Sequence, residues 1–195
     1  MKKYKILMAL MGLEIGGAET HVVELSKELK KQGYDIIVAS NGGVYEKELA
    51  EAGIRHYHVP LNQRNVLKMA RSYFILKKII KKEKVDIVHS HARIPSFVCG
   101  LLKERMKNSF TFVTSAHWVF YTGMGLKYIS NWGQKVIAVS DDIREYLMEN
   151  YKVPKNFLLR RTARRCGRNL ACRRRSRHWF MSAAWMKAAR WWQDS

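Results

Sequence analysis

The sequence feature that most constrains the fold is a strand, a glycine turn and a helix in direct succession at residues 5–33. An apolar run at residues 6–10 has the length of one buried strand, and Gly16 and Gly17 follow it in a turn. Apolar residues then recur at helical spacing over residues 22–29, with charged residues on the opposite side. Glycines let a backbone approach a ligand closely, and a helix start offers unpaired N–H groups, so the unit is suited to hold an anion such as a phosphate. A plain strand-to-helix turn without a ligand fits the same residues.

The same alternation of strand and helix continues to residue 151. Strand-like runs at 35–40, 55–59, 85–91, 110–117 and 135–140 are separated by helical patterns at 46–52, 62–84, 94–107 and 141–151. Strands that alternate with helices through short links indicate a parallel sheet covered on both faces. We therefore predict a Rossmann-like, three-layer α/β/α fold for residues 1–155.

Polar residues and glycines follow four of the predicted strands. Ligands of such sheets bind beyond the carboxyl ends of the strands, at the point where the strand order reverses. We predict that the residues at these ends line one site: Gly16 and Gly17 after the first strand, His91 and Arg93 after the fourth, His117 after the fifth and Ser140 after the sixth. We interpret His89, which lies inside the fourth strand, as an ordinary buried residue.

Composition divides the chain near residue 155. Residues 1–155 hold 25 Lys and Arg against 15 Asp and Glu, whereas residues 156–195 hold 11 against 1, and four of the six tryptophans lie in this second part. The second part has no clean period, so we predict an irregular basic tail of residues 156–195, of the kind that an out-of-frame reading would produce. Arginines among tryptophans could bind phosphates and stack on bases, but the lack of a pattern favours non-specific polyanion binding over a specific nucleic-acid site.

Several other classes of protein fit the sequence poorly. The cysteines Cys99, Cys166 and Cys172 form neither a metal-ligand spacing nor an even disulfide set, so we expect no metal and a reducing cytoplasm. The turn at residues 12–17 reads G-x-x-x-G-G, and no acid ends the second strand, which disfavours a dinucleotide-dependent oxidoreductase. A Rossmann-like binding module without catalysis stays open.

The residues around four strand ends together resemble a known family. GGAET at 16–20, VDIVHSHAR at 85–93, TSAHW at 114–118 and KVIAVSDDIREYL at 135–147 are similar to the N-terminal half of family 4 glycosyltransferases. The resemblance covers about residues 3–155 and implies a retaining hexosyltransferase of the two-domain GT-B architecture. It implies that a sugar passes from a nucleotide-sugar to an acceptor without a metal or other cofactor.

The resemblance also implies roles for individual residues. Gly16 and Gly17 would approach the donor diphosphate, because backbone N–H groups stabilise such a leaving group without side-chain bulk. His117 would be the catalytic residue beside the reacting sugar, since an imidazole can donate to or accept from a hydroxyl near neutral pH. Further candidates for binding the diphosphate or the acceptor are Glu19, His91, Arg93, Tyr121 and Ser140. A structural role is equally open for Arg93 at a solvated helix start, and for Glu19 in a helix first turn; for Ser140 a helix cap is the favoured interpretation.

The sequence departs from the family pattern in its second domain. The family holds the donor with two glutamates spaced E-x7-E, and no glutamate here is followed by another eight positions later. We therefore expect a chain that lacks the donor-binding domain and does not turn over alone. The expected acceptor is a saccharide, free or lipid-linked, in polysaccharide biosynthesis. The basic amphipathic helix at 62–84 could lie on an anionic membrane on the cytoplasmic side or could simply expose a solvated lysine face.

Overall fold

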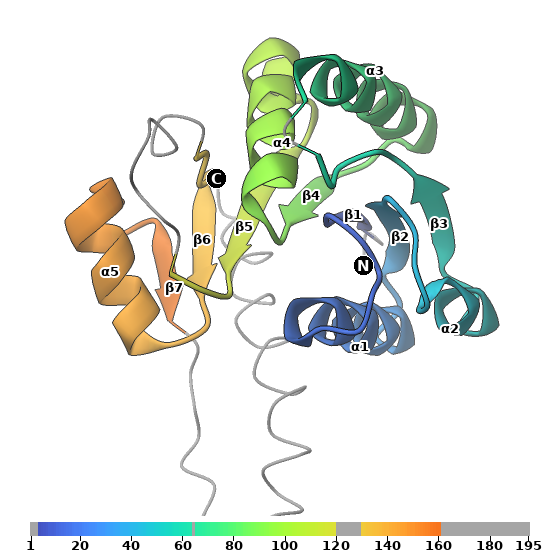
Figure 1. Ribbon diagram of the computed structural model, residues 1–195, viewed down its shortest axis with the longest axis horizontal. Coiled ribbons are helices and arrows are strands. Elements are labelled where there is room, and N and C mark those ends of the chain that lie inside the picture. The colour runs from blue at the N-terminus through green and yellow to red at the C-terminus, as the bar shows by residue number, and fades with distance from the viewer. Residues whose placement is uncertain (1–3, 64, 120–129, 161–195) are drawn as a thin grey trace, which may run out of the picture.

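The computed structural model describes residues 4–63, 65–119 and 130–160 of the chain (Figure 1). Tyr121 and the tail beyond residue 160 lie outside these residues. Within them, the strands and helices follow one another in the order that the hydrophobic pattern predicted.

Seven parallel strands form one sheet, in the order β3-β2-β1-β4-β5-β6-β7. From β1, the third strand in this order, the chain builds outward to β3, crosses back through α3 to β4, and then builds outward on the other side. The strand order therefore reverses between β1 and β4, which is where α/β sheets of this kind bind ligands. The strands are β1 (Lys5–Ala9), β2 (Asp35–Ser40), β3 (Arg55–His58), β4 (Ile87–Ser90), β5 (Thr111–Ala116), β6 (Lys135–Ala138) and β7 (Leu158–Arg160).

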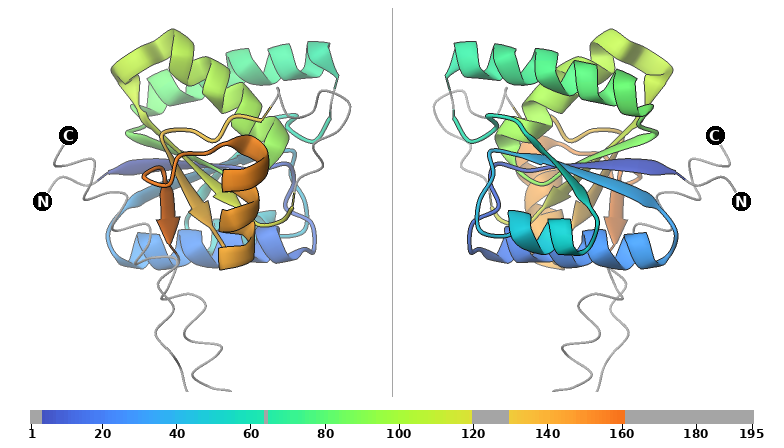
Figure 2. Two further views of the ribbon diagram at one scale, coloured as in Figure 1. Left: turned by 90° about the vertical axis from the view of Figure 1, so that its left-hand side faces the viewer. Right: turned by 90° about the vertical axis from the view of Figure 1, so that its right-hand side faces the viewer.

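Helices cover both faces of the sheet (Figure 2). One face carries α1 and α2, the other carries α3 and α4, and α5 packs on the end of the sheet formed by β5 to β7. The helices are α1 (Gly17–Lys31), α2 (Glu46–Glu51), α3 (Val66–Glu83), α4 (Arg93–Met106) and α5 (Asp141–Tyr151). The predicted three-layer, Rossmann-like fold is confirmed. No helix in the described part of the chain has the length and apolar character needed to cross a bilayer.

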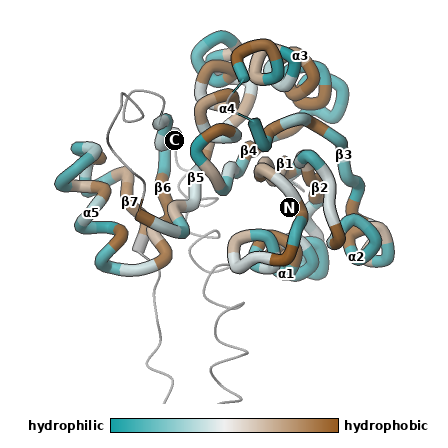
Figure 3. The backbone as a smooth tube through the Cα atoms, viewed as in Figure 1, coloured by the Kyte–Doolittle hydropathy of each residue, from teal (hydrophilic) through white to brown (hydrophobic). Residues whose placement is uncertain are grey.

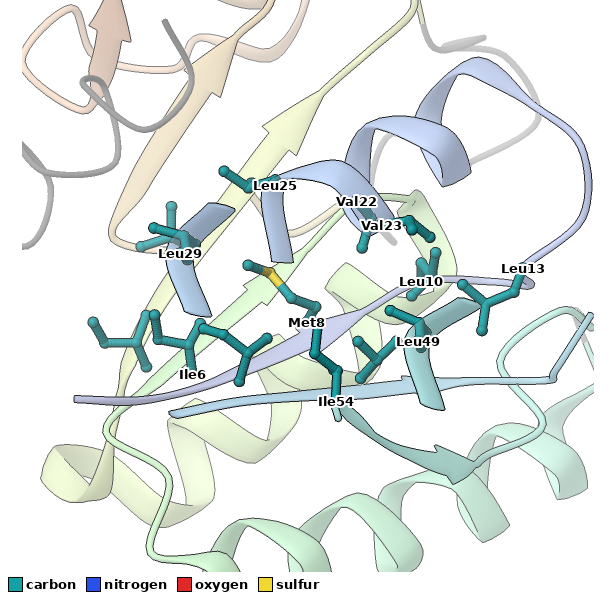
Figure 4. Packing of buried hydrophobic residues seen from close by; sticks show 14 of the residues in the cluster. Ile6, Met8, Leu10, Leu13, Val22, Val23, Leu25, Leu29, Leu49 and Ile54 are labelled. Carbon is teal, nitrogen blue, oxygen red and sulfur yellow. The ribbon is translucent and has the colours of Figure 1, made fainter. Parts of the chain in front are cut away.

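The residues of β1 show why this sheet has no face toward water. Ile6 and Met8 pack beneath α1 with Leu25 (Figure 4), whereas Leu7 and Ala9 face the α3 and α4 side. All four β1 residues named are 0% exposed. Hydrophobic residues recur at intervals along the covering helices (Figure 3), and their buried members lie at helical spacing on the side that faces the sheet. A strand covered on both faces reads as a continuous apolar run, as residues 6–10 do.

The sheet extends past residue 155, where the sequence suggested that the folded part ends. β7 pairs in parallel with β6, and its Leu158 lies opposite Val136. The Leu158 side chain is 7% exposed and packs in a cluster with Leu147 and Val153. Residues 156–160 therefore belong to the folded region, which corrects their assignment to the irregular tail. The apolar run at 157–159 is too short to show a period, and arginines follow it directly.

The basic helix α3 begins later than its pattern suggested. The pattern starts at residue 62, but the helix starts at Val66, because the Asn65 side chain caps it by accepting from the backbone N–H groups of Leu67 (2.9 Å) and Lys68 (3.2 Å). Lys84 ends it in the left-handed conformation, with φ of 53°.

Candidate functional site

The loop between β1 and α1 is fixed by the loop between β2 and α2. The Leu13 backbone N–H donates to the Gly42 carbonyl (2.9 Å), and the Leu13 carbonyl accepts from the Tyr45 N–H (3.1 Å). Gly43 makes this contact possible: its φ is 147°, and a Cβ there would stand 2.5 Å from the Leu13 carbonyl carbon. The Thr20 and Tyr45 hydroxyls add a 2.9 Å hydrogen bond. The start of α1 is therefore held at a set position above the edge of the sheet.

The first turn of α1 presents backbone rather than side chains. Gly16 is the N-cap residue and makes no side-chain cap, and its carbonyl accepts from the Thr20 N–H (3.0 Å). A Cβ on Gly17 would meet nothing within 4 Å among the described residues, apart from its chain neighbours and the helix backbone. Glu19 lies in this turn, and its carboxylate folds back so far that a Cβ on Gly16 would stand 2.2 Å from it. The glycine pair thus leaves the turn open on one side and lets Glu19 close over the cap on the other.

Four histidines gather next to this turn. His89 and His91 lie two residues apart at the end of β4, so both point to the face that α1 covers. His117, which follows β5, reaches His91, with 3.1 Å between His91 Nδ1 and His117 Nε2. His21, one turn into α1 from Gly17, completes the group. The ring centroids are 4.1 Å apart for His89 and His91, 5.3 Å for His21 and His117, and 5.4 Å for His91 and His117.

The two inner histidines of this cluster are neutral. Burial lowers the pKa of His89 to about 3, with further contributions from His21 and His117. Burial also lowers the pKa of His91 well below its ordinary value, followed by the effects of His89, His117 and His21. His89 Nε2 lies 2.8 Å from the Ser115 hydroxyl. Within the described residues, His89 Nδ1 and His91 Nε2 are buried without a hydrogen-bond partner.

Neutral His91 constrains the ring of His117. A neutral imidazole carries one N–H, so the contact between His91 Nδ1 and His117 Nε2 needs a donor on one ring and an acceptor on the other. When His91 donates, the proton of a neutral His117 stands on Nδ1; when His117 is charged, it donates from Nε2 to His91. In a third arrangement a neutral His117 donates from Nε2 to His91, and its own Nδ1 is then an acceptor; in all three arrangements the contact fixes the orientation of the His117 ring.

The other predicted residues are placed differently. The Arg93 guanidinium donates to the Tyr151 hydroxyl (2.8 Å), so this side chain joins the start of α4 to the end of α5. The Ser140 hydroxyl accepts from the Ile143 N–H (3.3 Å) and caps α5, as its position before the helix led us to expect. Trp118, the last residue of the TSAHW motif, is 77% exposed. Tyr121 lies outside the described residues.

Sequence patterns did not single out two members of this arrangement. His21 stands beside the apolar stripe of α1, and only the rotation of the helix over the sheet turns it toward His91 and His117. The one signal for His21 in the sequence is its place: it is a polar residue next to the apolar stripe, one turn after a glycine pair. His89 was interpreted as an ordinary buried residue, and it is fully buried against Ser115, but its ring also packs on His91.

Comparison with known proteins assigns this arrangement to a family. The sequence profile described as Glycosyltransferase Family 4 matches residues 15–159, which include all four clustered histidines. The chain belongs to glycosyltransferase family 4. This confirms the family that the strand-end residues predicted.

Relatives of this family 4 chain are known in sequence and in structure. A phosphatidylinositol N-acetylglucosaminyltransferase subunit from Homo sapiens is 25% identical over 153 residues, which are 75% of this chain and 31% of the relative. A glycosyltransferase from Rickettsia africae ESF-5 has 30% identity and a TM-score of 0.69, and the match covers 83% of this chain and 43% of that one. Anabaena Alr3699/HepE in complex with UDP has 13% identity and a TM-score of 0.63, covering 80% and 43%, and so shares the fold. The chain spans from about a third to less than half of these proteins.

Proposed function

We propose that this family 4 chain forms the acceptor side of a glycosyltransferase that moves a sugar from a nucleotide-sugar to an acceptor with retention. The observation that carries the proposal is the His91–His117 contact beneath the first turn of α1, at the edge where the strand order reverses. An oriented imidazole and an open helix start, side by side, suit a reaction that separates a sugar from a diphosphate.

The proposed roles follow from the chemistry of each group. The backbone N–H groups that follow Gly16 and Gly17 would stabilise the diphosphate leaving group, which gains negative charge as the glycosidic bond breaks. His117 would bind a hydroxyl of the reacting sugar through Nδ1, with its ring held by His91. A neighbour of the same fold was solved with UDP, which supports a nucleoside diphosphate as the leaving group.

We propose that no metal takes part in the transfer. The charge of the leaving group would instead be met by the helix dipole and the amides of the first turn of α1.

The acceptor and the location are part of the same proposal. We propose a saccharide acceptor, free or lipid-linked, and a cytoplasmic enzyme that works at the inner face of a membrane. A relative whose name includes phosphatidylinositol supports a lipid acceptor. Because the E-x7-E glutamates are absent from the sequence, we also propose that this chain does not turn over by itself.

Two sets of measurements test the proposal, the first on the chain alone and the second on a chimera. In the chain alone, titration with UDP-sugars followed by NMR should shift the amide signals of Gly16 and Gly17 and the ring signals of His117. Shifts confined to other elements would contradict the proposed site. Robust sugar transfer by this polypeptide alone would contradict the need for a donor domain.

The second set of measurements uses a chimera in which a donor domain from a family 4 enzyme follows residue 160. His117→Ala should lower kcat by about 10²- to 10⁴-fold with a much smaller effect on KM. His58→Ala, at an exposed histidine of β3, is the matched control and should leave kcat unchanged. Equal kcat for the two variants would exclude a catalytic role for His117.

A further inference from the structure

An open apolar groove runs between α3 and α4, on the face of the sheet away from the histidine cluster. Its volume is about 760 Å³, within the range of ligand-binding sites. Each helix contributes one stripe of side chains at helical spacing: Val66, Met69, Ala70, Tyr73, Phe74 and Lys77 from α3, and Ile94, Phe97, Val98, Leu101 and Arg105 from α4. Both stripes are apolar along most of their length and end in a cation.

The rim of the groove exposes large apolar side chains to solvent. Val66 is 79% exposed and Phe74 is 66% exposed, and Leu67 beside them is 80% exposed. The Tyr73 and Phe74 rings meet edge to face with centroids 5.4 Å apart, so they form a firm aromatic ridge along the groove. Exposed apolar side chains gathered on one surface mark an interaction site.

The surroundings of this groove carry positive charge. Besides Lys77 and Arg105 in its lining, α3 bears Lys68, Arg71, Lys78, Lys81 and Lys82 on its exposed surface. Glu83, the one acid of α3, is turned inward with its side chain 7% exposed. It accepts from Tyr57 (2.5 Å), Arg55 (2.9 Å) and Lys5 (3.1 Å), so its charge is already compensated. The outward charge of α3 is therefore uniformly positive.

We propose that α3 and α4 dock on an anionic lipid bilayer, with the exposed apolar residues entering the acyl region and the groove holding an acyl chain. The cations of α3, together with Arg105, would lie at the level of the lipid phosphates, as in interfacial amphipathic helices. A second copy of the chain would bring the same cations face to face, and residues 161–195 hold ten Lys and Arg against one Asp. Both of these occupants would meet like charge.

This orientation would set the site close to the bilayer. The groove begins at Val66 and Ile94, at the starts of the two helices, and Ile94 stands three residues after His91. Helix starts after β3 and β4 lie at the carboxyl edge of the sheet, where the histidines gather. The inference rests on the membrane location proposed for the enzyme, and its test measures binding alone, so a failure of sugar transfer leaves it standing.

The test is co-sedimentation of the full chain with phosphatidylcholine vesicles, with and without about one third phosphatidylglycerol. Lys77→Glu with Arg105→Glu should weaken binding to the anionic vesicles by about 25-fold or more, at about fivefold per charge removed. Lys31→Glu with Lys47→Glu makes the same change of charge on α1 and α2 and is the matched control. Phe74→Ser should weaken binding by about tenfold, whereas Val44→Ser, at a residue 58% exposed on another surface, should not.

Because the basic tail alone could attract anionic vesicles, a second readout locates the contact. Acetylation of lysines followed by mass spectrometry should show Lys77, Lys78 and Lys81 protected by the vesicles, and Lys31 and Lys47 unprotected. Equal binding by test and control variants, unprotected α3 lysines, or no binding of the native chain would overturn the proposal. A dimer that protects the same lysines without lipid would assign the groove to a second copy and overturn it as well.

Discussion

At the scale of single residues, the site depends on imidazoles that the fold keeps neutral. His89 and His91 are two residues apart on one strand, so one face of the sheet takes both, and burial excludes their charged forms. The strand-end rule could predict His91 and His117 from the sequence. It could not predict His21, because its place depends on how α1 rotates over the sheet, which tertiary packing decides.

The neutral pair makes stability depend on pH. The unfolded chain protonates its histidines near pH 6.5, while His89 and His91 in the folded chain stay neutral, so the unfolded state binds more protons below that pH. The folded state is therefore fully stabilised above about pH 6.5 and loses stability as the pH falls. We expect the free energy of unfolding to drop by about 1.4 kcal/mol per pH unit for each of the two histidines.

Urea unfolding at several pH values from about 7.5 to 5 measures this slope. His89→Gln can keep the contact with Ser115 but no longer titrates, so it should remove a large part of the slope, and the rest comes from His91 and from His56, whose pKa burial also lowers. His58→Asn, at an exposed histidine, is the control. A slope that His89→Gln leaves unchanged would mean that His89 is protonated in the folded chain.

At the scale of elements, the hydrophobic pattern predicted the type and order of β1 to β6 and of the five helices. The ends of elements depended on capping, which is why α3 starts after Asn65 rather than at residue 62. The contact between the two glycine loops is also a tertiary feature. The sequence marks Gly42 and Gly43 as a turn, but nothing in it shows that the turn lies against Leu13.

Gly33 and Gly43 both have positive φ, and a comparison of the two distinguishes the cost of backbone strain from the cost of a steric clash. Gly33 has φ of 92° with nothing within 4 Å of a Cβ among the described residues, whereas a Cβ on Gly43 would strike the Leu13 backbone at 2.5 Å. We expect Gly33→Ala to cost about 1–2 kcal/mol from the left-handed conformation. Gly43→Ala should cost at least about 1 kcal/mol more, because the Leu13 backbone must move.

Thermal unfolding of the two variants measures this difference. In addition, Gly43→Ala should shift the amide signals of Gly16 and Gly17 in NMR spectra, and Gly33→Ala should not. Equal losses of stability would show that the Leu13 backbone moves away from a Cβ at residue 43 at no cost in free energy.

At the scale of the whole molecule, the alternation of strands and helices was sufficient to predict a parallel sheet in three layers. The end of the folded region was not predictable in the same way. A three-residue edge strand has no period, and the change in composition at residue 155 falls just before β7. The change in composition marks where basic residues become more frequent. The end of the sheet depends instead on which apolar side chains are buried, and composition does not show that.

Leu158 should therefore stabilise the whole sheet rather than a tail. Its side chain is 7% exposed in the cluster with Leu147 and Val153, so Leu158→Ala should lower the free energy of unfolding by about 2–4 kcal/mol. Phe157→Ala, at a neighbour that is 39% exposed, should cost clearly less. Chemical denaturation compares the two, and a negligible loss for Leu158→Ala would show that the domain does not need β7.

The hydrogen bonds of Leu13 with Gly42 and Tyr45 hold the loop between β1 and α1 against the loop between β2 and α2, so that neither loop moves without the other. An insertion or deletion in residues 41–45 would displace the first turn of α1, although those residues belong to a different loop. Loop grafts between members of the family should therefore succeed when both loops are exchanged together and fail when either is moved alone.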